Sequence, residues 1–200
     1  MGRFGIWVNY RKNDVSKDVS QYMDMIVFCE GDTDVGAIRA VAKKLRVRVR
    51  PRRMVGNRPE KIARTCRALA QRYDKFIILK DLHRYQEETI KRIYRDTLRF
   101  ADAYFGKKIK FLIVRHAIEA WFLADADALS RIYNCRVAEI SNPEEIENPA
   151  EELGRLLGKH GKKYIKSERI GERIMNEADL QKVSKKSLSF KTFLKYLVDP

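Results

Sequence analysis

Acidic side chains crowd the end of the first strongly apolar stretch of this sequence. Residues 25–29 are apolar, and Glu30, Asp32 and Asp34 follow them around Gly31. Carboxylate oxygens are the ligands that hard divalent cations such as Mg²⁺ and Mn²⁺ prefer. A glycine also lets a metal or a phosphate approach the backbone. The segment predicts a metal site. Helix capping is the alternative for the two aspartates, but it leaves Glu30 unexplained.

Two later apolar stretches, residues 76–80 and 110–114, also end in side chains that can do chemistry. The polar residues at these ends are Lys80, Asp81, His83 and Arg84 after the first stretch, and Arg115, His116 and Glu119 after the second. Asp81 adds a carboxylate, and His83 is a ligand, a general acid or base, or an ordinary loop imidazole. His116 and Glu119 are three residues apart at an expected helix start, so they share a face or form a cap.

The elements that must position these residues alternate along the first two thirds of the chain. Apolar strands separated by amphipathic helices are typical of a doubly wound α/β fold. We therefore predict a mostly parallel central sheet of about four strands with helices on both faces. The expected strands are 25–29, 46–53, 76–80 and 110–114, and the expected helices are 34–45, one from Pro59, 86–105 and one from about Ala117.

Parallel strands end at the same edge of a sheet, so the acidic residues should meet there. Carboxylates at close range repel one another unless a cation or a proton lies between them. We predict one or two Mg²⁺ or Mn²⁺ ions at this edge. The expected ligands are Glu30, Asp34, Asp81, His83 and Asp125, with Glu30, Asp81 and Glu119 as catalytic residues.

The strand pattern stops after about residue 135, where Asn-Pro-Glu and Asn-Pro-Ala-Glu starts indicate helices. We predict an N-terminal extension at 1–22, an α/β core at 23–135 and a small helical attachment at 136–200. The last helix should run from Ser187 to about Leu197. These C-terminal helices offer a surface for a second copy of the chain or a partner protein.

The chain is strongly basic, with 42 Lys and Arg against 27 Asp and Glu and a net charge of +15 over 200 residues. Such a balance favours a nucleic-acid partner, although a heat-adapted surface has a similar composition. The alternating segment RVRVRPRR should present four arginines on one strand face, and its proline favours a sheet edge. The candidate phosphate contacts are Gly31, Lys80, Arg84, Arg115, Arg46, Arg48, Arg50, Arg52, Lys162 and Lys163.

The cysteines, Cys29, Cys66 and Cys135, are odd in number and far apart, with no zinc-binding spacing. Reduced, mostly buried thiols in a cytoplasmic protein are the simplest interpretation. No apolar run approaches the ~20 residues of a membrane span. We therefore expect no membrane association.

Glu30-Gly31 after a buried strand, with an acid four residues on, resembles the Toprim domain of topoisomerases, primases and OLD-family nucleases. Asp81 matches the first Asp of the Asp-x-Asp motif of that domain, and His83 stands where the second Asp belongs. More narrowly, HAIEAWFLADADAL, NPEEIENPAEEL and SLSFKTFLKYL are similar to an uncharacterised Toprim-like family. The resemblance covers about residues 25–197. It implies an acidic site at Glu30, Asp34, Asp81, Glu119 and Asp125.

These features together predict a divalent-metal-dependent phosphodiester hydrolase that acts on DNA or RNA. The alternative is a non-catalytic module that binds nucleic acid or a nucleotide, which His83 in place of an acid favours. A response-regulator type of phosphoacceptor, with Asp81 as the acceptor, ranks last because the late strand ends in Arg115 rather than a lysine.

Overall fold

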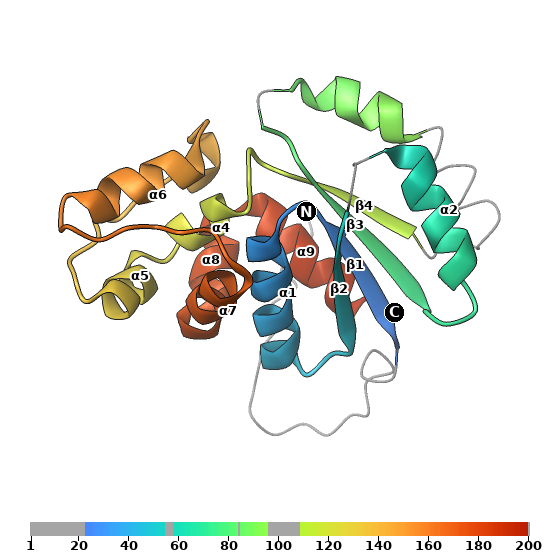
Figure 1. Ribbon diagram of the computed structural model, residues 1–200, viewed down its shortest axis with the longest axis horizontal. Helices are drawn as coiled ribbons and strands as arrows, with labels where there is room; N and C mark the ends of the chain where they lie inside the picture. The colour runs from blue at the N-terminus through green and yellow to red at the C-terminus, as the bar shows by residue number, and fades with distance from the viewer. Residues whose placement is uncertain (1–22, 55–57, 84, 96–108, 200) are drawn as a thin grey trace, which may run out of the picture.

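The computed structural model describes residues 23–54, 58–83, 85–95 and 109–199. Within these ranges four strands form one parallel sheet in the order β2-β1-β3-β4. The strands are β1 (Met25–Cys29), β2 (Val49–Arg53), β3 (Lys75–Asp81) and β4 (Ile109–Val114). The expected α/β class is confirmed, and the arrangement is consistent with a Toprim-like doubly wound fold (Figure 1).

Alternate residues of the sheet supply two different cores, as the twofold period of a strand requires. One face packs against α1 (Asp32–Leu45) and the C-terminal helices, and the other packs against α2 (Pro59–Leu69) and the helical residues 87–95. On β1, Val27 points to the first face and Phe28 to the second. Figure 1 shows α2 and α1 on opposite sides of the sheet.

The order of the strands places a topological switch point between β1 and β3. The chain passes from β1 through α1 to β2 at one edge, then returns through α2 to β3 on the other side of β1. Crossovers therefore leave these neighbouring strands in opposite directions, and the crevice beyond their carboxyl ends is the usual ligand site of such sheets. Glu30 follows β1 and Asp81 ends β3, so the fold brings both to this edge of the sheet at the switch point.

Two local predictions are corrected by the way that the helices end. Helix α1 runs to Leu45, and Arg46 is its C-terminal cap in the left-handed conformation (φ 57°), so it lies outside β2. The predicted arginine face of 46–53 is therefore shorter, and only Arg50 and Arg52 alternate within the strand. The prediction of an edge strand at Pro51 is confirmed.

The predicted helix from Ala117 is two helices, α4 (Glu119–Leu123) and α5 (Ala126–Tyr133). The chain breaks between them at Asp125, whose backbone (φ −124°, ψ 84°) is not helical and whose carboxylate caps α5. Asp125 therefore belongs to the start of α5 and not to one continuous helix from Ala117.

The C-terminal part is helical, as expected, and it shares a core with the sheet. Trp121 of α4 stacks with Phe193 (5.4 Å between ring centroids) and meets Phe190 edge to face (5.0 Å). Its indole N–H donates to Ser189 Oγ (2.8 Å). The elements here are the 3₁₀ turn Pro143–Glu145, α6 (Pro149–Gly158), α7 (Glu168–Glu177), α8 (Leu180–Lys186) and α9 (Leu188–Val198).

Helices α1 and α7 cross at a pair of glycines. A Cβ on Gly36 would lie 1.8 Å from Glu168 O, and a Cβ on Gly171 would lie 2.0 Å from Thr33 O. Only glycine permits this separation, so each helix presses its backbone against the other. The crossing fixes the first turn of α1, which carries Asp34, relative to α7.

Some predictions fall outside the described residues. These are the N-terminal extension at 1–22 and the part of the predicted helix 86–105 beyond residue 95. Within the described ranges, every helix is too short or too polar to span a lipid bilayer.

Candidate functional site: an acidic cluster at the sheet edge

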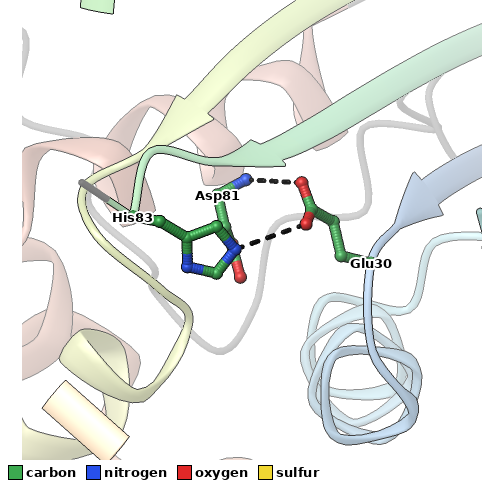
Figure 2. A group of neighbouring side chains, drawn as sticks. All are labelled: Glu30, Asp81 and His83. Atoms are coloured by element: carbon green, nitrogen blue, oxygen red, sulfur yellow. Dashed lines mark hydrogen bonds and ion pairs between the residues drawn. The ribbon is translucent and has the colours of Figure 1, made fainter. Parts of the chain in front are cut away.

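The side chain of Glu30 contacts β3 just beyond the end of β1. Its Oε1 accepts a hydrogen bond from the backbone N–H of Asp81 at 3.1 Å, and it also contacts the ammonium group of Lys80. On the other side, Glu30 Oε2 lies 3.5 Å from Nε2 of His83 (Figure 2). Burial alone would raise the pKa of Glu30. The hydrogen bonds from His83 and Lys80 and the charge of Lys80 outweigh it, so the pKa lies below its usual value. Glu30 is therefore an ionised carboxylate at neutral pH.

Asp34 combines the two roles that the sequence left open, cap and acidic-site residue. Its Oδ2 accepts hydrogen bonds from the amides of Glu30 (3.1 Å) and Gly31 (2.9 Å), which fixes the turn between β1 and α1. Burial first, and then the charges of Glu119 and Glu30, raise the pKa of Asp34 to about 6 against the two hydrogen bonds. Its other oxygen, Oδ1, accepts no hydrogen bond from the described part of the chain.

Asp81 is the least compensated carboxylate of the cluster. Only 8% of its surface is exposed. Its side chain accepts no hydrogen bond from any residue that the structure describes. Burial, and after it the charges of Asp34, Glu30 and Glu119, raise the pKa of Asp81 well above its usual value, although Lys80 opposes them. A buried carboxylate with acidic neighbours and no donor lowers stability unless a cation or a proton joins it.

Glu119 enters the cluster from α4 and is held by the segment 159–167 between α6 and α7. Its carboxylate is almost fully buried and accepts a hydrogen bond from the hydroxyl of Tyr164 (3.0 Å). The ammonium group of Lys166 lies 2.8 Å from the same oxygen. The negative charge of Glu119 reaches both Asp34 and Asp81. The first turn of α4 therefore belongs to the site.

His83 and His116 connect the ends of β3 and β4, and the backbone of both residues is strained. Both have positive φ angles, 47° for His83 and 59° for His116, which side-chain-bearing residues adopt at a cost. The amide of His83 donates to His116 O at 2.8 Å, and Nδ1 of His116 lies 3.0 Å from His83 O. These contacts hold the imidazole of His83 against Glu30.

The donor set of this cluster fits a hard divalent cation. Glu30, Asp81 and His83 each offer a ligand atom, and these atoms lie within 4.8 Å of one another. The carboxylate of Asp81 is buried without a hydrogen bond from the described residues, which is the state expected of a ligand that a cation would complete. Carboxylate oxygens with one imidazole suit Mn²⁺ and accept Mg²⁺. Asp34 and Glu119 act on this group through their charge, which raises the pKa of Asp81.

The structure separates other predicted residues from this cluster. Both oxygens of Asp125 bind amides, those of Ala128 (3.2 Å) and Asp179 (2.8 Å), so the position of Asp125 gives its predicted metal role no support. Lys80 is buried, and its ammonium group pairs with Glu30. Its first role is therefore that of a counter-ion to Glu30 rather than the predicted phosphate contact. Arg84 lies outside the described residues.

The predicted basic contacts lie around the edge of the sheet and beyond it. Arg115 faces Glu87 at 3.7 Å, Arg48 faces Asp24 at 3.3 Å, and Arg50 contacts the hydroxyl of Tyr73 at 3.3 Å. Arg52, at the carboxyl end of β2, lines a hollow of about 170 Å³ with Arg53, Arg58 and Lys61. Lys162 and Lys163 are exposed on the segment that holds Glu119.

Sequence reasoning missed the roles of Tyr164 and Lys166. They lie 45 and 47 residues beyond Glu119, in a segment without helical or strand periodicity, so no local pattern links them to it. The predicted phosphate contacts Lys162 and Lys163 were the one available signal nearby, and they indicated nucleic acid rather than a buried glutamate.

Comparison with known proteins identifies the family of this chain and leaves its activity open. No curated protein and no solved structure matches the chain. Residues 29–198, from the end of β1 to the end of α9, match the family described as a domain of unknown function (DUF4276). The match includes the acidic cluster and the helices that enclose it, so the chain belongs to the DUF4276 family.

Proposed function

We propose that this protein is a divalent-metal-dependent phosphodiester hydrolase that acts on nucleic acid at the acidic edge of its sheet. One observation carries the proposal: the carboxylate of Asp81 is buried among Glu30, Asp34 and Glu119 and accepts no hydrogen bond within the described residues. Acids with perturbed pKa values that converge at one edge of a sheet are typical of active sites. The net charge of +15 supports a polyanionic substrate.

Glu30, Asp81 and His83 would hold the cation, with Asp34 and Glu119 beside them. A bound divalent cation supplies an activated water and neutralises charge on the phosphate. Glu30 stays ionised and keeps its orientation through Lys80 and the Asp81 amide. Asp34, with a pKa of about 6, is suited to take a proton from water near neutral pH. Lys166, which pairs with Glu119, would add positive charge beside the substrate phosphate.

A non-catalytic nucleic-acid-binding module is the second candidate, and a specific contact favours it. Lys80 already neutralises Glu30 without any metal, and the imidazole of His83 contacts the other oxygen of Glu30. A site with its own internal cation can persist as a structural remnant. The resemblance to Toprim nucleases favours the hydrolase, and this relationship is itself a proposal.

Metal titration joined to a cleavage assay separates these candidates. We expect calorimetry to detect Mn²⁺ binding to the wild-type protein and a loss of at least tenfold in affinity in Asp81→Asn. Asp127→Asn is the matched control, because this exposed aspartate pairs with Lys182 away from the cluster. Cleavage of labelled DNA or RNA that requires Mn²⁺ and Asp81 would support the hydrolase. Metal binding without cleavage would favour the module. Absence of metal binding to the wild type would refute the metal site.

A further inference from the structure

The extended segment 162–167 presents different side chains on its two sides. Tyr164 and Lys166 point to Glu119. Lys163, Ile165 and Ser167, the alternating residues, line a separate hollow of about 260 Å³. One short stretch of chain therefore forms a wall that the acidic cluster and this hollow share.

The second hollow is basic and carries cations that have no acidic partner. Lys163, Arg169 and Arg173 line it, and none of its lining residues in the described part of the chain is acidic. Lys163 and Arg169 form no ion pair within the described ranges, whereas other arginines such as Arg39 and Arg131 pair with glutamates. Arg173 donates to the carbonyl of Ile132 at 3.1 Å. The first turn of α7, which begins after Ser167, adds the positive end of a ten-residue helix.

Tyr133 supplies a second and independent observation. This residue lines the same hollow, and its hydroxyl is shielded from water and has no hydrogen-bond partner among the described residues. Buried hydroxyl groups are almost always hydrogen-bonded, so such a donor needs an acceptor, and the described residues do not provide one. The phenol of Tyr133 is also close enough to that of Tyr164 for the two to interact electrostatically. Tyr133 therefore lies between the basic hollow and the residues that hold Glu119.

Ile165 gives the hollow an apolar rim. Its side chain is 70% exposed, which makes it one of the most exposed large apolar residues in the described structure. Cations combined with an exposed apolar surface match the chemistry of single-stranded nucleic acid, whose phosphates need charge and whose unpaired bases need apolar contact.

We propose that this hollow binds a backbone phosphate of a single-stranded nucleic acid, with Lys163, Arg169 and the Tyr133 hydroxyl as donors and Ile165 against the adjacent base. The phosphate is a different one from that at the acidic cluster, because Tyr164 and Lys166 separate the two positions. The inference extends the proposed function and rests on it for the nature of the substrate. It assigns the 162–167 segment as the part of the protein that guides the strand past the acidic cluster.

The test measures binding in EDTA, where no metal-dependent cleavage occurs. A labelled single-stranded DNA of about 20 nucleotides, and its RNA counterpart, exceed the ~4–16 nucleotides that one small domain covers. We expect Lys163→Ala/Arg169→Ala to lower affinity roughly tenfold. The slope of log affinity against log salt should fall by about 0.7 for one lost phosphate contact. The control, Lys191→Ala/Lys195→Ala, removes the same charge from exposed positions of α9 and should change affinity much less.

Tyr133→Phe distinguishes a ligand role from a structural role. Loss of a hydroxyl without a partner should leave the thermal midpoint unchanged or raise it, while affinity falls severalfold. Equal losses in the hollow and control variants, or no binding by the wild type, would overturn the inference. Binding through the hollow without Mn²⁺-dependent cleavage would refute the hydrolase and leave the inference standing. Mn²⁺-dependent cleavage by the wild type, together with unaltered binding by Lys163→Ala/Arg169→Ala, would support the hydrolase and overturn the inference.

Discussion

Two buried aspartates show that burial alone does not define a functional acid. Asp81 and Asp125 are both nearly inaccessible, at 8% and 2% exposed. Asp125 accepts two backbone amides, and Asp81 accepts no hydrogen bond from the described residues. Asp125 is therefore a structural acid whose two oxygens both have backbone partners, whereas burial and acidic neighbours disfavour the ionised form of Asp81.

The corresponding Asn variants should therefore change stability in opposite directions. Without divalent cations at neutral pH, Asp81→Asn should raise the free energy of unfolding by about 1 kcal/mol, since a repelled buried carboxyl group is removed. Asp125→Asn should lower it by about 1–3 kcal/mol, because the amide cannot accept both N–H groups. Thermal unfolding in EDTA measures both. Equal destabilisation by the two changes would contradict the assignment of Asp81.

Asp34 should make stability depend on pH in a direction opposite to that of an ordinary paired acid. Its carboxyl has a pKa of about 6 in the folded protein and of about 3.8 in the unfolded chain. Between these values the folded state binds more protons, so stability falls as pH rises from about 4 to 6. The shift corresponds to at most about 3 kcal/mol. Unfolding curves of the wild type and Asp34→Asn in EDTA should diverge across this window. Parallel curves would refute the raised pKa.

At the scale of elements, the close crossing of α1 and α7 positions the site from outside it. This crossing fixes the start of α1, and hence Asp34, against the start of α7 and the segment that holds Glu119. Backbone contact leaves almost no freedom for one helix to slide along the other. A small displacement would move Asp34 relative to Glu119.

Alanine at either crossing glycine should be severely destabilising. Gly36→Ala or Gly171→Ala places a Cβ within about 2 Å of a backbone oxygen, and we expect a loss of about 3 kcal/mol or more. Gly154→Ala in α6 is the control, because a Cβ there meets nothing within 4 Å. It should be neutral or stabilising by up to ~1 kcal/mol through helix propensity. Chemical denaturation of the three variants provides the comparison. Tolerance of alanine at Gly36 would show that the helices can separate without loss.

The sequence predicted the elements whose signal is local and missed the contacts that depend on distant residues. Apolar stretches located β1, β3 and β4, and Pro51 correctly indicated an edge strand. The predicted start of β2 was wrong, because the alternation of RVRVR gives no sign of the left-handed helix cap at Arg46. Parallel topology predicted that Glu30 and Asp81 meet. The contact of Tyr164 with Glu119 was not predictable, since tertiary packing of an aperiodic segment creates it.

At the scale of the whole molecule, the helices after residue 135 and the sheet form one packed body. Trp121 lies between the α/β core and α9, and its indole N–H depends on Ser189. Glu144, in the turn before α6, accepts the amides of Leu188 and Ser189 at 3.0 Å each. The three sequence blocks that carried the family resemblance thus meet at one place. Their joint occurrence therefore has a structural reason.

This packing predicts that the two parts unfold together and that neither folds alone. Calorimetry of the full chain should give a single transition whose van't Hoff and calorimetric enthalpies agree. A fragment that ends at residue 135 would expose the aromatic surface of Trp121 and leave its N–H group without a partner, at a combined cost of several kcal/mol. That cost is comparable with the whole stability of a typical domain, so the fragment should lack a cooperative thermal transition. It should also lose the proposed metal site, because Tyr164 and Lys166, which hold Glu119, would be absent. A fragment that melts cooperatively and binds Mn²⁺ would show instead that residues 136–200 are a separable attachment and that the acidic cluster forms without them.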